Sequence, residues 1–245
     1  MEEKEVLKKV SELSIFFPFW NEEKNVESVV KDAVPVAARI AEKWEILIID
    51  DGSIDKTPEI AARLVKENPQ HIRLISHHPN RGYGAALREG FMQAKYNLVV
   101  FSDGDKQFDF SEVTKFLEAI QGVDVVIGYR RQRNDKNIFK RLLLMNLLKI
   151  WDFLLFHFSF RDIDCGFKMF RREALDKILP LRSEGAMITT EILAKAKKKK
   201  LKIREVGVMH YPREHGLQTG ANFPVILRAV LESFILWYDL HYGRT

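Results

Sequence analysis

The chain has 245 residues, of which 46% are hydrophobic and 30% charged, a globular composition that excludes a disordered chain or a coiled coil. Its one cysteine, Cys165, excludes an intramolecular disulfide and a cysteine-rich zinc site, and it fits a reducing compartment. The net charge of +5 favours anionic partners, which include phosphorylated ligands, nucleic acid and anionic lipid surfaces.

The N-terminal segment, MEEKEVLKKVSEL, is charged throughout and lacks the apolar core and cleavage site of a signal peptide. The longest apolar stretches, 142–148 and 153–160, fall short of the roughly 18 residues that suggest a spanning helix. We therefore expect a cytoplasmic protein that is peripheral, not integral, if it meets a membrane.

Strands and helices alternate along the first half of the chain. Short apolar runs predict strands at 14–19, 45–49, 72–76, 98–101 and 123–127, with helical spacing of apolar residues between them. Strands that are apolar on both faces and separated by helices predict an α/β fold with a mainly parallel sheet flanked by helices. After Arg130 the alternation stops, and an α+β half follows with an isolated strand-like segment at 166–170.

Polar side chains follow the predicted strands at the point where each strand ends. Because the binding crevice of such a sheet opens at the carboxyl ends of its strands, these side chains are expected at one rim. They are Asp50, Asp51, Asn80, Asp103, Asp105 and Arg130.

The segment SDGDKQ carries two carboxylates, Asp103 and Asp105, on either side of a glycine that permits a tight turn. Oxygen ligands in a rigid turn suit Mg²⁺ or Mn²⁺ bridging the phosphates of a nucleotide. An ordinary acidic turn is the alternative, because this triplet is common in loops.

Asp50 and Asp51 follow the second strand, where paired acids can accept hydrogen bonds from a base and ribose. Asp55 and Thr57, just beyond them, fit a helix-capping turn. The glycine-rich loop 80–84 opens a helix, where backbone N–H groups favour an anion. The loop lacks the third glycine of a Rossmann fingerprint, and the chain has no Walker A sequence.

Seven segments in this order resemble the family 2 glycosyltransferases of the GT-A fold, and among them polyprenyl-phosphate glycosyltransferases such as dolichol-phosphate mannose synthase. The resemblance covers about Ser14 to Glu214. The segments are SIFFPFWNEEKNV, EILIIDDGSIDKT, NRGYGAALREGF, FSDGDKQFD, GYR, DCGFKMFRR, and TEILAKA followed by REVGVMHYPRE. FSDGDKQFD departs from the more frequent D-A-D-x-Q-H form, which leaves the sugar donor open.

The resemblance implies roles for particular residues on the donor side. Asp50 and Asp51 would contact the nucleotide, with Pro18 and Glu22 lining the same pocket. Asp103, Asp105 and Gln107 would hold Mg²⁺ or Mn²⁺ and the diphosphate of a GDP- or UDP-linked sugar. Arg213 lies at a family position in a mobile loop that would close over the diphosphate, unless Pro212 makes this a structural turn.

On the acceptor side, the resemblance implies that Arg130 and Arg141 bind the phosphate of a polyprenyl or dolichyl phosphate. Glu191 matches an acidic position that is a general base in many relatives. A sugar hydroxyl in a polysaccharide or glycolipid would need that base, whereas a lipid phosphate is already an anion and needs little deprotonation. Asp105, Arg130 and Glu191 are thus the predicted catalytic residues, and Glu191 either acts as a base or orients other groups.

The resemblance divides the chain into a GT-A domain at 1–222 and a C-terminal amphipathic helix at 223–245. The domain has a nucleotide-sugar half, 1–130, and an acceptor half, 131–222. Stretches 139–160 and 224–240 mix basic residues with leucines and aromatics, as helices at an anionic membrane interface do, and as buried or oligomer-contact helices also do. A homo-oligomer is left open.

Two other classes fit less well. A nucleotidyltransferase would need a glycine-rich basic loop after the first strand, where this chain has Pro18 to Asn21. A nucleic-acid-binding module could use the lysine run 197–200, but the acidic rim would repel a phosphate backbone. We expect no nucleic-acid partner.

Overall fold

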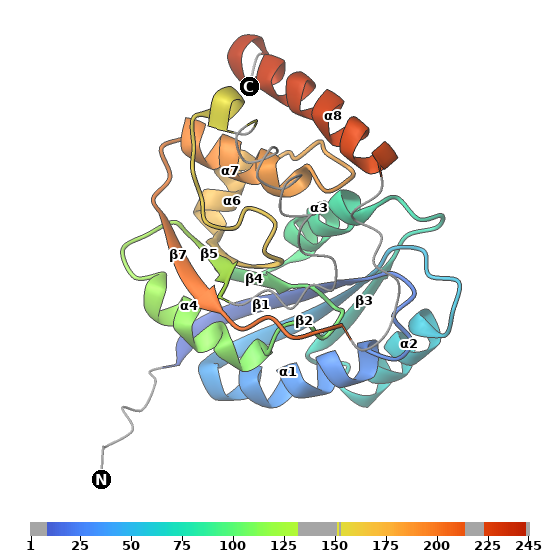
Figure 1. Cartoon of the computed structure of the whole chain (residues 1–245). Coiled ribbons are helices and arrows are strands. Elements are labelled where there is room, and N and C mark those ends of the chain that lie inside the picture. The colour runs from blue at the N-terminus through green and yellow to red at the C-terminus, as the bar shows by residue number, and fades with distance from the viewer. Residues whose placement is uncertain (1–8, 132–150, 152, 214–222, 244–245) are drawn as a thin grey trace.

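A seven-stranded sheet runs through the centre of the molecule in the order β3-β2-β1-β4-β6-β5-β7 (Figure 1). The computed structural model describes residues 9–131, 151, 153–213 and 223–243. All neighbouring strands pair in parallel except β6, which runs antiparallel to β4 and β5. This confirms the predicted α/β class with a mainly parallel sheet. The strands are β1 (Val10–Phe19), β2 (Ala41–Asp50), β3 (Ile72–Ser76), β4 (Leu98–Ser102), β5 (Val125–Arg130), β6 (Phe167–Arg171) and β7 (Ile203–Val208).

Helices cover both faces of the sheet and bury a hydrophobic core on each side. Neighbouring residues of β1 alternate between the two cores, since Ile15 and Phe17 face one and Phe16 faces the other. The first core packs under α1 (Val26–Ile40), α2 (Thr57–Glu67) and α4 (Val113–Ala119), with the short 3₁₀ helix η1 (Phe110–Glu112) beside them. The second packs under α3 (Tyr83–Gln93), α6 (Arg172–Ile178), α7 (Ile188–Lys198) and α8 (Phe223–Tyr242) (Figure 1).

The bounds or the pairing of several strands differ from the sequence prediction. β1 begins at Val10, four residues early, because its polar start pairs with the start of β2. The strand at 166–170 is not isolated, since β6 lies in the sheet between β4 and β5. β7 was not predicted, because its alternation of partly exposed residues is typical of an edge strand and carries little apolar signal.

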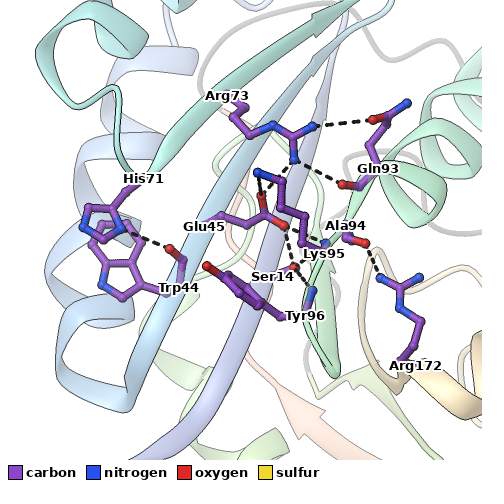
Figure 2. A network of polar contacts seen from close by, with 10 residues as sticks. All are labelled: Ser14, Trp44, Glu45, His71, Arg73, Gln93, Ala94, Lys95, Tyr96 and Arg172. Carbon is purple, nitrogen blue, oxygen red and sulfur yellow. Dashed lines mark hydrogen bonds and ion pairs between the residues drawn. The ribbon is translucent and has the colours of Figure 1, made fainter.

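A buried carboxylate fastens the connection between α3 and β4 to the sheet (Figure 2). Glu45 on β2 accepts hydrogen bonds from the Ser14 hydroxyl at 2.7 Å, the Lys95 backbone N–H at 2.7 Å and the Arg73 guanidinium at 2.9 Å. The Ser14 hydroxyl oxygen in turn accepts from the backbone N–H groups of Lys95 and Tyr96. The network satisfies the polar groups buried where β4 begins.

The C-terminal helix α8 lies on the outside of the molecule against α7 (Figure 1). Leu236 and Leu240 bury one side of it in the second core. Among the residues that the structure describes, no helix has both the length and the apolar character to cross a membrane.

Candidate active site

The two acidic pairs lie at one rim, because β2 and β4 run parallel and end at the same edge of the sheet. Asp50 is the last residue of β2 and Asp103 directly follows β4. β6 runs the other way, so its beginning, next to Gly166, reaches the same rim, where the Gly166 carbonyl accepts from the Asp103 N–H at 2.9 Å. The predicted crevice at the carboxyl ends of the strands therefore has acids from two strands around it.

Asp51 is buried and fully engaged by its own chain. Its Oδ1 lies 2.7 Å from Nδ1 of His77 and accepts the Arg81 N–H at 3.0 Å, while its Oδ2 accepts the Gly82 N–H at 2.8 Å. Its backbone carbonyl accepts from the side-chain amide of Asn80. Asp51 thus shapes the loop that precedes α3.

The glycine-rich loop was expected to offer backbone N–H groups to an anion. The anion at Arg81 and Gly82 is the chain's own Asp51, and the Gly84 N–H donates to the Glu184 carbonyl at 2.7 Å. These N–H groups are therefore already hydrogen-bonded within the fold. They do face a negative charge, as expected of such a loop, but the charge belongs to the chain itself. The loop still lines an open pocket of about 450 Å³ with Glu184 and Gly185.

Asp50 differs from its neighbour because one of its oxygens is left over. Its side chain is fully buried, and Oδ1 accepts the Ser53 N–H at 3.2 Å. Oδ2 has no hydrogen-bond partner within the described part of the chain. A buried carboxylate oxygen without a donor is a site that a ligand N–H or O–H would satisfy. The Thr57 N–H donates to the Asp55 side chain at 2.9 Å, but the N-cap position of α2 is held by Lys56, which makes no side-chain capping hydrogen bond.

Asp103 and Asp105 are two acidic residues at the rim whose pKa values are both raised. Burial, and after it the nearby carboxylate of Asp105, raise the pKa of Asp103 from 3.8 to about 7, against the opposing Tyr83 hydroxyl and the charges of Lys168 and Arg130. Burial likewise raises the pKa of Asp105, against Arg213. The Tyr83 hydroxyl donates to Asp103 at 2.8 Å, and the Gln107 N–H donates to Asp105 at 3.1 Å.

Arg213, far away in sequence, joins the first strand's loop to this acidic pair. Its Nη2 donates to Glu22 and lies 3.6 Å from the Asp105 carboxylate. Burial raises the pKa of Glu22, while Asn25 and Arg213 oppose that shift. Pro18, on β1, brings its carbonyl to the site as well, since a Cβ on Gly104 would lie 2.7 Å from that oxygen. Pro18, Glu22, Asp105 and Arg213 therefore lie near one another at the rim.

The carboxylate oxygens at this rim are suitable ligands for a hard divalent cation. Two half-buried carboxylates that repel each other would both be stabilised as anions by a cation, and Mg²⁺ is often held by one or two carboxylates plus substrate phosphates. Within the described ranges, no cluster of three or more His, Cys, Asp or Glu side chains could hold a metal without further ligands. Gln107 is turned toward the loop after β7, where its amide donates to the Tyr211 carbonyl at 3.0 Å.

Arg130 ends β5 and is held by a residue that the sequence did not single out. Its Nε and Nη2 donate to the two oxygens of Asp162, both at 2.7 Å, and its backbone N–H donates at 3.1 Å. Burial would lower the pKa of Arg130, but the paired Asp162 raises it above its ordinary value. Arg130 is thus a cation whose guanidinium is fixed in place by Asp162. Arg141, its predicted partner, lies outside the described residues.

Glu191 is buried near the start of α7, not on the helix surface. Both of its oxygens accept the Arg182 N–H, at 2.9 and 3.0 Å, and Oε2 also accepts the Ser183 N–H at 2.8 Å. Lys195, one turn later, lies 2.8 Å from Oε1 and forms an i,i+4 ion pair with it. The carboxylate is therefore engaged in holding the loop before α7.

Sequence reasoning missed four residues of the rim: Tyr83, His77, Asp162 and Lys168. Tyr83 and Asp162 bind the predicted Asp103 and Arg130 directly, and His77 binds Asp51. Lys168 is a fully buried lysine in β6. A lysine inside the apolar run FKMF was a visible signal, because lysine is almost never fully buried without a partner.

Comparisons with known proteins give a family profile, related sequences and solved structures of the same fold. The sequence profile described as glycosyl transferase family 2 matches residues 14–179. A dolichyl-phosphate beta-glucosyltransferase of Saccharomyces cerevisiae is 33% identical over 80% of this chain and 66% of its own length. A dodecaprenyl-phosphate galacturonate synthase of Rhizobium johnstonii is 25% identical over 95% of this chain and 70% of its own.

Among solved structures, glucosyl-3-phosphoglycerate synthase of Mycobacterium tuberculosis, in complex with Mn²⁺, UDP and its product, superposes with a TM-score of 0.67. It is 20% identical over 93% of this chain and 80% of that chain, so it shows a shared fold. The predicted GT-A fold is thereby confirmed. The chain spans just under two thirds of the length of the dolichyl-phosphate beta-glucosyltransferases that it matches, 66% of the yeast protein and 65% of the Dictyostelium discoideum one.

Proposed function

The chain belongs to glycosyl transferase family 2, and from this premise we propose that it transfers a hexose from a nucleotide sugar to a polyprenyl phosphate. The carrying observation is the half-buried pair Asp103 and Asp105, which repel each other at the carboxyl end of β4 beside the Arg213 guanidinium. Relatives that act on dolichyl and dodecaprenyl phosphates support the lipid acceptor. We expect inversion at the anomeric carbon, because the acceptor oxygen would attack that carbon directly.

On the donor side, the unsatisfied Oδ2 of Asp50 would accept a hydrogen bond from the nucleoside, while Asp51 keeps the neighbouring loop in shape. Asp103 and Asp105 would hold Mg²⁺ or Mn²⁺ together with the diphosphate, with Gln107 nearby. When bound, the metal supplies charge stabilisation for the departing nucleoside diphosphate. Arg213, hydrogen-bonded to Glu22 at the same pocket, would add a second positive charge at the leaving group.

On the acceptor side, the state of Glu191 separates the two candidate acceptors. Its oxygens already accept backbone N–H groups and face Lys195, which leaves it poorly placed to take a proton from a sugar hydroxyl. A polyprenyl phosphate needs little deprotonation, so the arrangement supports a phosphate nucleophile with Glu191 as an orienting residue. Arg130, fixed by Asp162, would bind that phosphate.

The outer side of α8 supports contact with a membrane surface. It presents a stripe of exposed apolar and aromatic side chains at helical spacing: Leu231, Phe234, Ile235, Tyr238 and Tyr242. The exposed lysines 197–200 follow from the end of α7, against which α8 packs. An apolar stripe beside basic residues suits an interface with anionic headgroups, on the cytoplasmic face if the sequence prediction holds. Binding to anionic vesicles that disappears with Leu231→Ser and Ile235→Ser combined would support this surface, and unchanged binding would oppose it.

The decisive experiment supplies radiolabelled GDP-mannose, UDP-glucose or UDP-N-acetylglucosamine with a polyprenyl phosphate, detergent and Mn²⁺ or Mg²⁺. We expect label in the organic phase with one donor, and none with chelator present. No organic-phase label with any donor, together with label on an added sugar hydroxyl acceptor, would replace the lipid acceptor by the hydroxyl one. Full transfer in chelator would remove the metal from the proposal.

A further inference from the structure

Lys168 is a fully buried cation in the middle of the sheet. It lies on β6 opposite Phe101 of β4 and Ile127 of β5, and its Nζ is 5.9 Å from the centroid of the Phe101 ring. Burial lowers the pKa of Lys168, because an ammonium group loses its water there. An apolar side chain of similar length would fill the same space without that desolvation cost. Packing alone therefore gives no reason for a lysine at this position.

The Lys168 ammonium closes the turn that comes before β6. Its Nζ donates to the carbonyl oxygen of Ile163 at 3.0 Å and to that of Cys165. Both carbonyls belong to the segment 162–165, which runs along the rim between the two halves of the site. One side chain therefore fixes the path of this turn from beneath.

The turn contacts both the metal side and the phosphate side of the candidate site. At its start, Asp162 accepts three hydrogen bonds from Arg130. At its end, the Gly166 carbonyl accepts the Asp103 N–H, and a Cβ on Gly166 would lie 1.9 Å from Oδ2 of Asp103. A small shift of this turn would displace the Asp103 carboxylate and the Arg130 guanidinium together.

The charges around Lys168 agree with this geometry. The carboxylates of Asp162, Asp164 and Asp103 all act on Lys168 as favourable charges. A positive charge under three carboxylates holds them near one another, where they would otherwise repel. The lysine thus has partners on each side of the rim, although its hydrogen bonds go to the turn.

We propose that Lys168 is a positioning residue that sets the distance between the Asp103 carboxylate and the Arg130 guanidinium by fixing the turn 162–165. The inference rests on the proposed function in that these two groups serve the donor and the acceptor. Lys168 touches neither substrate. Its loss should therefore weaken binding at the rim far more than it weakens the fold.

The test compares Lys168→Met with Met169→Ala. Met169 is the next residue of β6, is equally buried, and faces the opposite core. Mn²⁺ binding is measured by electron paramagnetic resonance in the presence of UDP and, separately, GDP, and the melting temperature of each variant is measured without ligand. We expect Lys168→Met to bind Mn²⁺ with nucleotide at least tenfold more weakly with a small change in melting temperature. Met169→Ala should show the reverse: a larger loss of melting temperature, and affinity within about twofold of wild type.

Lys168→Arg, which keeps the charge and the donors, should recover part of the affinity. If Lys168→Met does not fold, Lys168→Gln replaces it in both measurements and must also bind at least tenfold more weakly. Affinity within twofold of wild type in Lys168→Met or Lys168→Gln would overturn the proposal, and so would an equal loss in Met169→Ala. Failure of the wild-type protein to bind Mn²⁺ with either nucleotide would instead contradict the proposed function.

Discussion

Two acidic sites on the same sheet differ in how their carboxylates are paired with other groups. Around Glu45, where β4 begins, hydroxyl, backbone and guanidinium donors satisfy both oxygens of the carboxylate (Figure 2). Around Asp103 and Asp105, where β4 ends, partial burial raises the pKa of both carboxyls, and the Asp105 carboxylate also raises that of Asp103. The two sites are separated by the length of one strand.

The difference separates polar groups that stabilise the fold from polar groups that are available to bind a ligand. A satisfied buried network stabilises one conformation, and removal of a member leaves orphaned donors. A pair of half-buried like charges destabilises the metal-free protein and gives that free energy back when a cation binds. The following predictions test this contrast, from the largest expected effect to the smallest.

Asp105→Asn should separate activity from stability. Removing one carboxylate should lower metal-dependent sugar transfer by roughly 100- to 1,000-fold, a loss typical of removing one transition-state-stabilising group. The repulsion with Asp103 disappears, so the melting temperature of the metal-free protein at neutral pH should rise or stay unchanged. Transfer assays and thermal unfolding measure the two effects.

Asp176→Asn is the matched control, because Asp176 is an exposed acid on α6. It should leave both transfer and melting temperature unchanged. A marked fall in the stability of Asp105→Asn would mean that the acidic pair is a structural element like Glu45, and the contrast between the two ends of β4 would fail.

Glu45→Ala should have the opposite profile. It leaves the Arg73 guanidinium and the Lys95 N–H without their acceptor, which should lower the free energy of unfolding by about 3 kcal/mol. Transfer per folded molecule should not change, because the site lies at the other end of the strands. Urea denaturation and specific activity provide the two values.

The exposed Glu42 on the same strand supplies the comparison for that experiment. Glu42→Ala should shift the free energy of unfolding by no more than about 0.5 kcal/mol. Equal effects of the two substitutions would show that the Glu45 network contributes nothing beyond a surface charge.

Asp103 should make a measurable contribution to the pH dependence of stability. Its pKa is raised from 3.8 to about 7 in the folded protein, so between these values the folded state binds more protons than the unfolded state. Stability contributed by this group is therefore lost as pH rises through that window. Metal-free wild type should lose more stability from pH 4 to pH 7 than Asp103→Asn does, and saturating Mn²⁺ should reduce the loss. Parallel curves for the two proteins would contradict the raised pKa.

Much of the fold, and of the acidic rim at the ends of β2 and β4, could be predicted from the sequence, because both follow from local patterns. Continuous apolar strands gave the parallel sheet, and the end of each strand located Asp50, Asp51, Asp103 and Asp105. The resemblance to the family added Arg213, which joins the rim from a distant loop.

Other features depend on pairing between distant segments and left no local signal. β6 inserts antiparallel between β4 and β5, and this placement alone brings Asp162 to Arg130 and Gly166 to Asp103. The spacing of residues in one segment cannot encode which strand lies beside it. For the same reason the engagement of Asp51 by His77 and the loop after it was not predicted.

The substitution Glu191→Gln tests whether Glu191 is a structural acid like Glu45 or a reactive acid like Asp105. If it is a satisfied structural acid like Glu45, the amide presents N–H groups where an oxygen accepted the Arg182 and Ser183 N–H groups, and the free energy of unfolding should fall by about 1–2 kcal/mol. Transfer to a polyprenyl phosphate should then fall by less than about tenfold, because that acceptor needs no general base. Glu173→Gln, at an exposed acid in the first turn of α6, controls for the loss of a helix-terminal charge. A loss of transfer beyond about 1,000-fold at unchanged stability would make Glu191 a reactive group like Asp105, and a base of that kind would require a hydroxyl acceptor in place of the lipid phosphate.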